Sequence, residues 1–254
     1  MVLIMAKTKK STRIASIVLT FVMLLSVFCV AGTATASAAT DKVSMYSSSV
    51  LFTKYAINHY EVFVKTNDNG ANQKVFIHYN YIKNEAWQDV AAEYYTTLSD
   101  GSKIWRATFH SMSGLYAIRF ESNGRVYWDN NNNANYTNSD RLGVAPIVSE
   151  RIGYQYLGYG SNGYQVNALL QNYAYHKNVF VRYTVNGWQS YTDKALTYSQ
   201  SNGNNTETWT TTLNINGMPE HGKFQYAICY QVNGREYWAN NFGANYDEYY
   251  YIHR

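Results

Sequence analysis

Residues 117–136 read AIRFESNGRVYWDNNNNANY, and residues 227–246 read AICYQVNGREYWANNFGANY. In both stretches the Trp precedes the final Tyr by eight residues. A self-match at a fixed offset, here about 110 residues, is typical of a repeated structural unit. Both copies keep aromatic and asparagine side chains rather than acids, bases or a nucleophile. The sequence therefore predicts two copies of one unit.

The match extends to both sides of these passages. Residues 75–79 match residues 179–183. Three further aromatic pairs lie at similar offsets: Trp87 with Trp188, Tyr94 with Tyr198, and Trp105 with Trp209. The offset changes within polar, turn-rich stretches, where insertions are tolerated. Because Pro146 lies between the copies, we expect a leader at 1–38, a first module at 39–144 and a second module at 145–254.

Short alternating runs dominate the chain after the leader. Residues 60–64 and 179–183 are examples, rich in the β-branched and aromatic residues that suit strands. Asn-Gly pairs such as Asn123-Gly124 and Asn233-Gly234 separate the runs and supply the positive φ of tight hairpins. We expect an all-β chain with two tandem antiparallel β-sandwich modules.

Residues 1–38 have the features of a secretory signal peptide. Four basic residues precede an apolar run at 14–32, and the small residues ATASAA follow at 34–39. Cleavage after Ala38 would give a secreted protein, extracellular or associated with the cell surface. The apolar run is also long enough to span a bilayer, so an uncleaved anchor is the alternative.

The charge of the chain bears on its binding partners, and its cysteine content bears on disulfide formation. The leader holds four of the 21 basic residues and none of the 17 acidic ones, so the rest of the chain is balanced. Nucleic-acid binding, which needs a basic surplus, is therefore not expected. Only Cys229 follows the leader, which excludes an intramolecular disulfide there and predicts a buried, small apolar residue.

The recurring aromatic and asparagine residues suit a neutral sugar. An indole stacks on the C–H face of a pyranose, while Asn amides and Tyr hydroxyls both donate and accept hydrogen bonds. Trp105 and Trp209 lie inside strand patterns and are expected in the core. For the other tryptophans, packing in the core remains the alternative to sugar stacking.

Three motifs of the second copy carry a family resemblance: VFVRYTVNGW at 179–188, ALTY at 195–198, and YWANNFGANY at 237–246. They resemble carbohydrate-binding module family 21, which includes the starch-binding domain of fungal glucoamylase and glycogen-targeting subunits of type-1 protein phosphatase. The resemblance implies an immunoglobulin-like β-sandwich that binds starch or glycogen. It covers most of residues 55–250, in two tandem copies.

The resemblance also assigns sugar-binding residues, motif by motif. In the first copy these are Trp87, Trp128, Asn130, Asn132 and Asn135. In the second copy they are Trp188, Trp238, Asn240 and Asn245, with a second site at Tyr175 and Tyr198. The copies differ where Asn132 is replaced by Phe242 and Asp129 by Ala239. We expect one site in the first copy and two in the second.

No catalytic residue, metal ligand or cofactor is predicted. A calcium loop starting at Asp129 would need Gly at its sixth position, where Ala134 stands. A glycosidase needs two positioned carboxylates, and no carboxylate is clearly shared by both copies; an enzyme active in one copy remains an alternative.

The sequence thus predicts a secreted, non-catalytic protein that binds α-1,4-glucan: starch, glycogen or maltooligosaccharides. It would hold the polymer near the cell or near secreted amylases, with no nucleic-acid partner and no membrane beyond the leader. The alternative is a secreted adhesin or interaction module that binds another glycan or a protein.

Overall fold

In a computed structural model of the chain, the described residues are 42–156, 162–214 and 221–251. Their regular structure is β-strand, apart from one 3-10 turn at Asn241–Gly243. Within these ranges no helix is long and apolar enough to cross a membrane. The all-β prediction is confirmed. The predicted leader lies outside the described residues.

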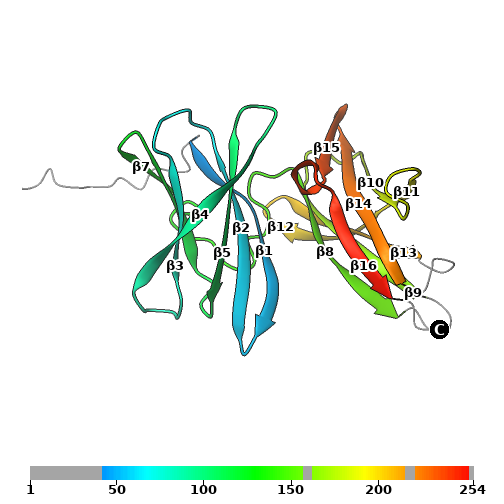
Figure 1. Cartoon of the computed structure of the whole chain (residues 1–254), viewed down its shortest axis with the longest axis horizontal. Helices are drawn as coiled ribbons and strands as arrows, with labels where there is room; N and C mark the ends of the chain where they lie inside the picture. The colour runs from blue at the N-terminus through cyan, green and yellow to red at the C-terminus, as the bar shows by residue number, and fades with distance from the viewer. Residues whose placement is uncertain (1–41, 157–161, 215–220, 252–254) are drawn as a thin grey trace, which may run out of the picture. The chain divides into compact units, whose positions relative to one another are not determined.

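Seven antiparallel strands form the first half of the described chain (Figure 1). They are β1 (Val43–Lys54), β2 (Ile57–Thr66), β3 (Lys74–Asn80), β4 (Trp87–Thr97), β5 (Lys103–Ser111), β6 (Tyr116–Ser122) and β7 (Arg125–Asp129). Their order is β1-β2-β5-β4-β3-β6-β7. This path folds into two layers, one with β1, β2 and β5 and the other with β3, β6 and β7. β4 belongs to both layers, because its first part pairs with β3 and its last part, Glu93 to Thr97, pairs with β5.

The second half contains two separate antiparallel sheets. Its strands are β8 (Ile147–Tyr156), β9 (Asn162–Gln171), β10 (Lys177–Thr184), β11 (Thr192–Ala195), β12 (Thr197–Gly203), β13 (Thr206–Asn214), β14 (His221–Val232), β15 (Arg235–Ala239) and β16 (Tyr246–Tyr251). One sheet has the order β12-β13-β9-β8; the other has the order β11-β10-β14-β15, with β16 also paired to β14.

The two halves share one strand order. β1, β2, β3, β5, β6 and β7 correspond in turn to β8, β9, β10, β13, β14 and β15. β4 corresponds to β11 plus β12, because the buried Leu196 interrupts the second half at that point. Even the contact after the last hairpin recurs: Tyr116 pairs with Tyr136, and Tyr226 pairs with Tyr246.

Alternation of buried and exposed residues explains why these segments are strands. Every second residue is buried from Tyr60 to Thr66 of β2 and from Val75 to Tyr79 of β3, as the period-2 pattern requires for a sheet with one face in the core. Each half has its own cluster of buried residues drawn from both of its layers. Trp105 and Trp209 are partly buried and pack against these clusters, so the prediction that they lie in the core is confirmed only in part; Cys229 is fully buried, as predicted.

The segment between β7 and β8 is fixed by specific contacts. Gln171 of β9 donates from Nε2 to the Gly143 carbonyl at 2.8 Å and from its backbone N to the Pro146 carbonyl at 3.0 Å. A Cβ on Gly143 would lie 1.9 Å from the Met45 carbonyl oxygen, so only glycine fits. Arg141 forms an ion pair with Glu150. The module limits 39–144 and 145–254 stay a prediction.

Candidate functional site

The loops that follow β7 and β15 have the same hydrogen bonds. Backbone N of Asn135 donates to the Asn130 carbonyl at 2.8 Å, and backbone N of Asn245 donates to the Asn240 carbonyl at 2.8 Å. Nδ2 of Asn131 donates to the Asn135 carbonyl at 3.1 Å, and Nδ2 of Asn241 donates to the Asn245 carbonyl at 3.2 Å. The two loops therefore have the same backbone structure, held by their own hydrogen bonds.

The backbone conformation explains why asparagine recurs in these loops. The φ angles are 52°, 55°, 70° and 59° at Asn131, Asn132, Asn133 and Asn135. The corresponding residues Asn241, Phe242, Gly243 and Asn245 have φ angles of 49°, 54°, 98° and 63°. Asparagine and glycine tolerate positive φ better than other residues, so part of the motif specifies backbone shape. Phe242 is the exception, since it is neither asparagine nor glycine.

The predicted asparagine ligands fall into two groups. Oδ1 of Asn130 and Asn240 already accepts a backbone N–H, from Asn133 at 3.0 Å and Gly243 at 3.1 Å. In contrast, the amide groups of Asn135 and Asn245 form no hydrogen bond to any other described residue. The first group closes the loop, and the second group is available to a ligand.

Asp129 is part of the fold of its loop. Its buried carboxylate accepts hydrogen bonds from the Met45 backbone N at 2.7 Å and the Tyr136 hydroxyl at 2.7 Å. Within the described ranges no group of three His, Cys, Asp or Glu side chains is placed to hold a metal ion. Asp129 thus anchors the loop to β1, a contact that Ala239 cannot make in the second half.

An aromatic cluster lies on the outer face of the first half. The His78 ring stacks on Trp87, with centroids 5.0 Å apart, and meets Trp128 edge-on at 5.3 Å. Nδ1 of His78 donates to Asp89 at 2.7 Å, and Arg119 donates to the other carboxylate oxygen at 2.6 Å. The structure therefore brings two of the predicted aromatic residues together through an unpredicted histidine.

The second half has an equivalent cluster built from different residues. The Arg182 guanidinium lies 4.2 Å from the Tyr191 ring centroid and 5.4 Å from that of Trp238, distances typical of cation–π contacts. Asp193 holds this guanidinium through two 2.7 Å hydrogen bonds. Arg182 occupies the place of His78, because β10 matches β3 residue by residue from Val179 and Val75.

Strand register corrects one predicted pairing. His78 pairs with Asp89 and Arg182 pairs with Asp193, so Trp87 corresponds to Tyr191 rather than to Trp188. Trp188 lies in the preceding turn with φ of 68°, and its buried Nε1–H has no hydrogen-bond partner among the described residues. A comparison of the sequences matches Trp87 with Trp188 because both are tryptophan, and so does not identify Tyr191. Matching Asp89 with Asp193 gives the correct pair, Trp87 with Tyr191.

The predicted second site is spread over the second half. Tyr175 is 90% exposed, and its ring contacts His176. Tyr198 lies on β12 and meets Trp209 edge-on at 6.2 Å. Within the described residues no ring contact joins Tyr175 to Tyr198. Tyr94 meets Trp105 in the same way at 6.0 Å, and Tyr94 and Tyr198 are 55% and 54% exposed.

The electrostatics of the clusters favour binding over acid catalysis. Burial tends to raise the pKa of Asp89, but hydrogen bonds from His78 and Arg119 lower it overall. Hydrogen bonding to Asp193 raises the pKa of Arg182, so the guanidinium stays charged. A glycosidase acid needs a raised pKa and a free carboxyl group. Asp89 and Asp193 instead position their aromatic neighbours.

Comparison with known proteins gives a family match for part of the chain. Residues 165–248 match the family model described as "Carbohydrate/starch-binding module (family 21)". "Glycogen-binding subunit 76A" of Drosophila melanogaster is 32% identical over 78 residues, 30% of this chain and 12% of that protein. "Protein phosphatase 1 regulatory subunit 3B" of Danio rerio is 35% identical over 80 residues, 30% of this chain and 27% of that protein. The match thus spans less than a third of each relative.

One solved structure is also similar: the solution structure of the carbohydrate binding module of the muscle glycogen-targeting subunit of Protein Phosphatase-1. It shares 21% identity and a TM-score of 0.35, covering 41% of this chain and 75% of that one.

Proposed function

We propose, from the premise that residues 165–248 form a family 21 carbohydrate-binding module, that this protein binds α-1,4-glucan without catalysing its cleavage. The proposal extends the premise to the first half, which we assign as a second module of the same kind. The immunoglobulin-like description of both sandwiches, and an extracellular location, belong to the same proposal. Secreted amylases as partners remain a prediction.

The single observation that carries this proposal is the shared loop. In each loop one asparagine amide, that of Asn135 or Asn245, makes no hydrogen bond within the described part of the chain, and the loop backbone has the same hydrogen bonds in both halves. Each loop follows a strand that carries a partly exposed tryptophan, Trp128 or Trp238. A stacking ring beside free amides suits a neutral polyhydroxylated ligand.

The arrangement suits a polymer better than a single sugar. Two binding faces on one chain make the second contact intramolecular, which raises the apparent affinity for a long ligand. Each stacked ring would contribute on the order of 1–3 kcal/mol, by analogy with bases stacked on aromatic side chains. We therefore expect tighter binding to amylopectin and glycogen than to short maltooligosaccharides.

Retardation in gels that contain amylopectin, glycogen, xylan or a peptidoglycan digest tests the proposal. We expect retardation by the two α-glucans, and loss of it in the Trp128→Ala/Trp238→Ala variant. Tyr55→Ala is the matched control, because Tyr55 is 85% exposed in the β1–β2 turn, outside the two clusters.

Three results would contradict the proposal. Retardation only by xylan or peptidoglycan would support the adhesin alternative. A large fall in the melting temperature of the tryptophan variant would place these rings in the core. Reducing sugar released from starch by the pure protein would show an enzyme.

A further inference from the structure

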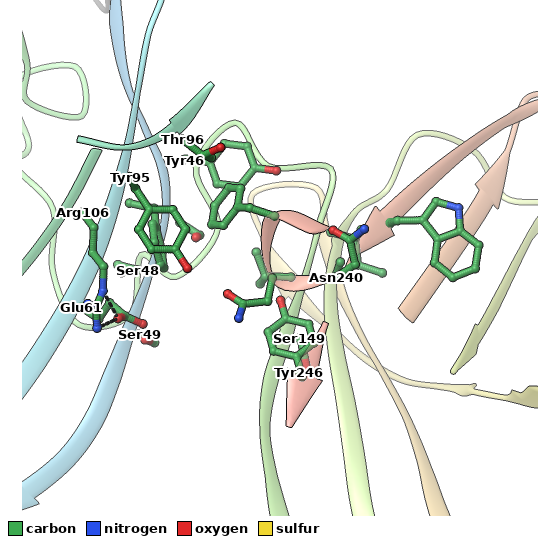
Figure 2. Close-up of a pocket in the computed structure, with 18 of the residues that line it drawn as sticks. Tyr46, Ser48, Ser49, Glu61, Tyr95, Thr96, Arg106, Ser149, Asn240 and Tyr246 are labelled. Atoms are coloured by element: carbon green, nitrogen blue, oxygen red, sulfur yellow. Dashed lines mark hydrogen bonds and ion pairs between the residues drawn. The ribbon is translucent and has the colours of Figure 1, made fainter. Parts of the chain in front are cut away.

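A cavity of about 830 Å³ lies between the β1-β2-β5-β4 layer and the loop after β15. Figure 2 shows Tyr46, Tyr95 and the Glu61–Arg106 pair on one side and Asn240 and Tyr246 on the other. Its volume falls within the range of about 300–1,000 Å³ common for ligand pockets. Its lining does not include His78 or Arg182, although Trp238 contributes both to the cavity and to the outward cluster of the second half.

Phe242 determines how this cavity is formed. Its ring lies 4.9 Å from that of Phe63, 5.4 Å from that of Tyr46 and 5.4 Å from that of Tyr95. The equivalent residue of the other loop, Asn132, is exposed. A phenylalanine with φ of 54° is strained, so the strain is offset by this aromatic contact. Through this contact, Asn240 of the same loop lies in the lining of the cavity.

The chemistry of the lining is aromatic, hydroxylated and neutral. Tyr46, Tyr95 and Tyr246 supply rings, and hydroxyl groups come from residues such as Ser49 and Thr96. The charges are compensated: Arg106 bonds to Glu61 at 2.7 Å, and Arg141 pairs with Glu150. Such a lining offers no net charge to an ionic ligand but suits a neutral sugar chain.

We propose that this cavity is an additional binding site for a neutral α-glucan segment, formed only when Phe242 docks the second loop against Tyr46, Phe63 and Tyr95. The proposal rests on the function proposed above. In it, Tyr95 stacks on a sugar ring, while the Nδ2 group of Asn240 and the Tyr46 hydroxyl bond to sugar hydroxyls. Because burial raises the pKa of Tyr46, its phenol remains a hydrogen-bond donor at neutral pH.

Calorimetric titration with maltoheptaose tests this site in the full chain. In a Trp128→Ala/Tyr191→Ala background, which weakens the outward faces without changing the lining of the cavity, we expect residual binding. Adding Tyr95→Ala should weaken that residual binding at least tenfold, and adding Tyr46→Phe should weaken it while keeping the ring contact with Phe242. Tyr55→Ala in the same background is the control and should change nothing.

Phe242→Asn, which copies the tip of the first loop, tests how the site is formed. We expect it to remove the residual binding without changing the melting temperature of either half by much. Full residual binding in this variant would overturn the requirement for docking.

The outcomes separate this inference from the proposed function. If the wild type binds maltoheptaose but the Trp128→Ala/Tyr191→Ala variant does not, or if Tyr95→Ala has no effect, the cavity site is wrong and the function stands. If the wild type binds no α-glucan, both are wrong.

Discussion

At the scale of single residues, Asp129 shows how a residue inside a sequence motif can have a structural role. The sequence suggests a loop carboxylate next to the sugar motif. The structure buries it and bonds it to the Met45 backbone and the Tyr136 hydroxyl. Burial, followed by the nearby Asp129 charge, also raises the pKa of Tyr136, so this phenol stays a donor.

We therefore expect Asp129→Ala to lower the free energy of unfolding by roughly 3 kcal/mol, because two buried donors would lose a charged acceptor. Urea denaturation followed by tryptophan fluorescence measures this. Asp140→Ala, at a partly exposed carboxylate of the same segment, provides a comparison. An unchanged midpoint for Asp129→Ala would show that the buried bonds contribute little.

Tyr191 supplies a second residue-scale prediction. In a Trp128→Ala background, Tyr191→Ala should weaken α-glucan binding by about 5- to 150-fold, the equivalent of about 1–3 kcal/mol for one lost stacking ring. Trp188→Gly should have a smaller effect, because the Trp188 side chain lies in the preceding turn and glycine tolerates its φ. Calorimetry with maltoheptaose compares the two; a larger loss for Trp188→Gly would restore the pairing expected from sequence.

These residues mark the limit of sequence reasoning. The repeat, its strands and the Asn-rich loops can be predicted from the sequence, because they depend on local patterns and turn chemistry. His78, Arg182 and Tyr191 were not identified as site residues, because their meeting depends on strand register. The contacts of Phe242 cannot be predicted from the sequence for a related reason. Its partners Tyr46, Phe63 and Tyr95 lie far from it along the chain and meet it only in the folded protein.

At the scale of elements, each Asn-rich loop needs a particular backbone shape and is also proposed to bind the sugar. Substitutions at Asn135 separate these two roles. Asn135→Gly keeps the positive φ but removes the amide, whereas Asn135→Ala also strains the backbone. We expect Asn135→Gly, in a Trp238→Ala background, to weaken glucan binding with little loss of stability. Asn135→Ala should lower stability as well. Equal binding by Trp238→Ala and Trp238→Ala/Asn135→Gly would show that the amide does not contact the ligand.

The β2–β3 loop gives a pH-dependent prediction. Hydrogen bonds from Ser122, Lys42 and the Gly70 backbone lower the pKa of Asp68 from 3.8 to about 2. A carboxylate whose pKa is lowered by folding stabilises the protein above its unfolded pKa, and this contribution disappears as the pH falls through the folded pKa.

The stability difference between wild type and Asp68→Asn should therefore be constant above about pH 5 and shrink between about pH 4 and pH 2. Urea denaturation at a series of pH values checks it. A difference that does not vary over this range would mean that the Asp68 contacts are not made in solution.

At the scale of the whole molecule, the two halves share a strand order but are not equivalent. The first has a free loop tip at Asn132, and the second uses Phe242 to contact the first. The first carries His78 where the second has Arg182. Duplicated units of this kind can divide their roles, one presenting an open face and the other also forming a contact between halves.

The strand that both layers of the first half share has a consequence for amide hydrogen exchange. Because β4 pairs with β3 in one layer and β5 in the other, its opening breaks bonds in both at once. In the second half, β11 and β12 can open separately on either side of Leu196. Native-state exchange read by mass spectrometry should therefore show β3 and β5 exchanging as one cooperative group, with β10 and β13 as two. Two groups in the first half would mean that β4 does not couple its layers.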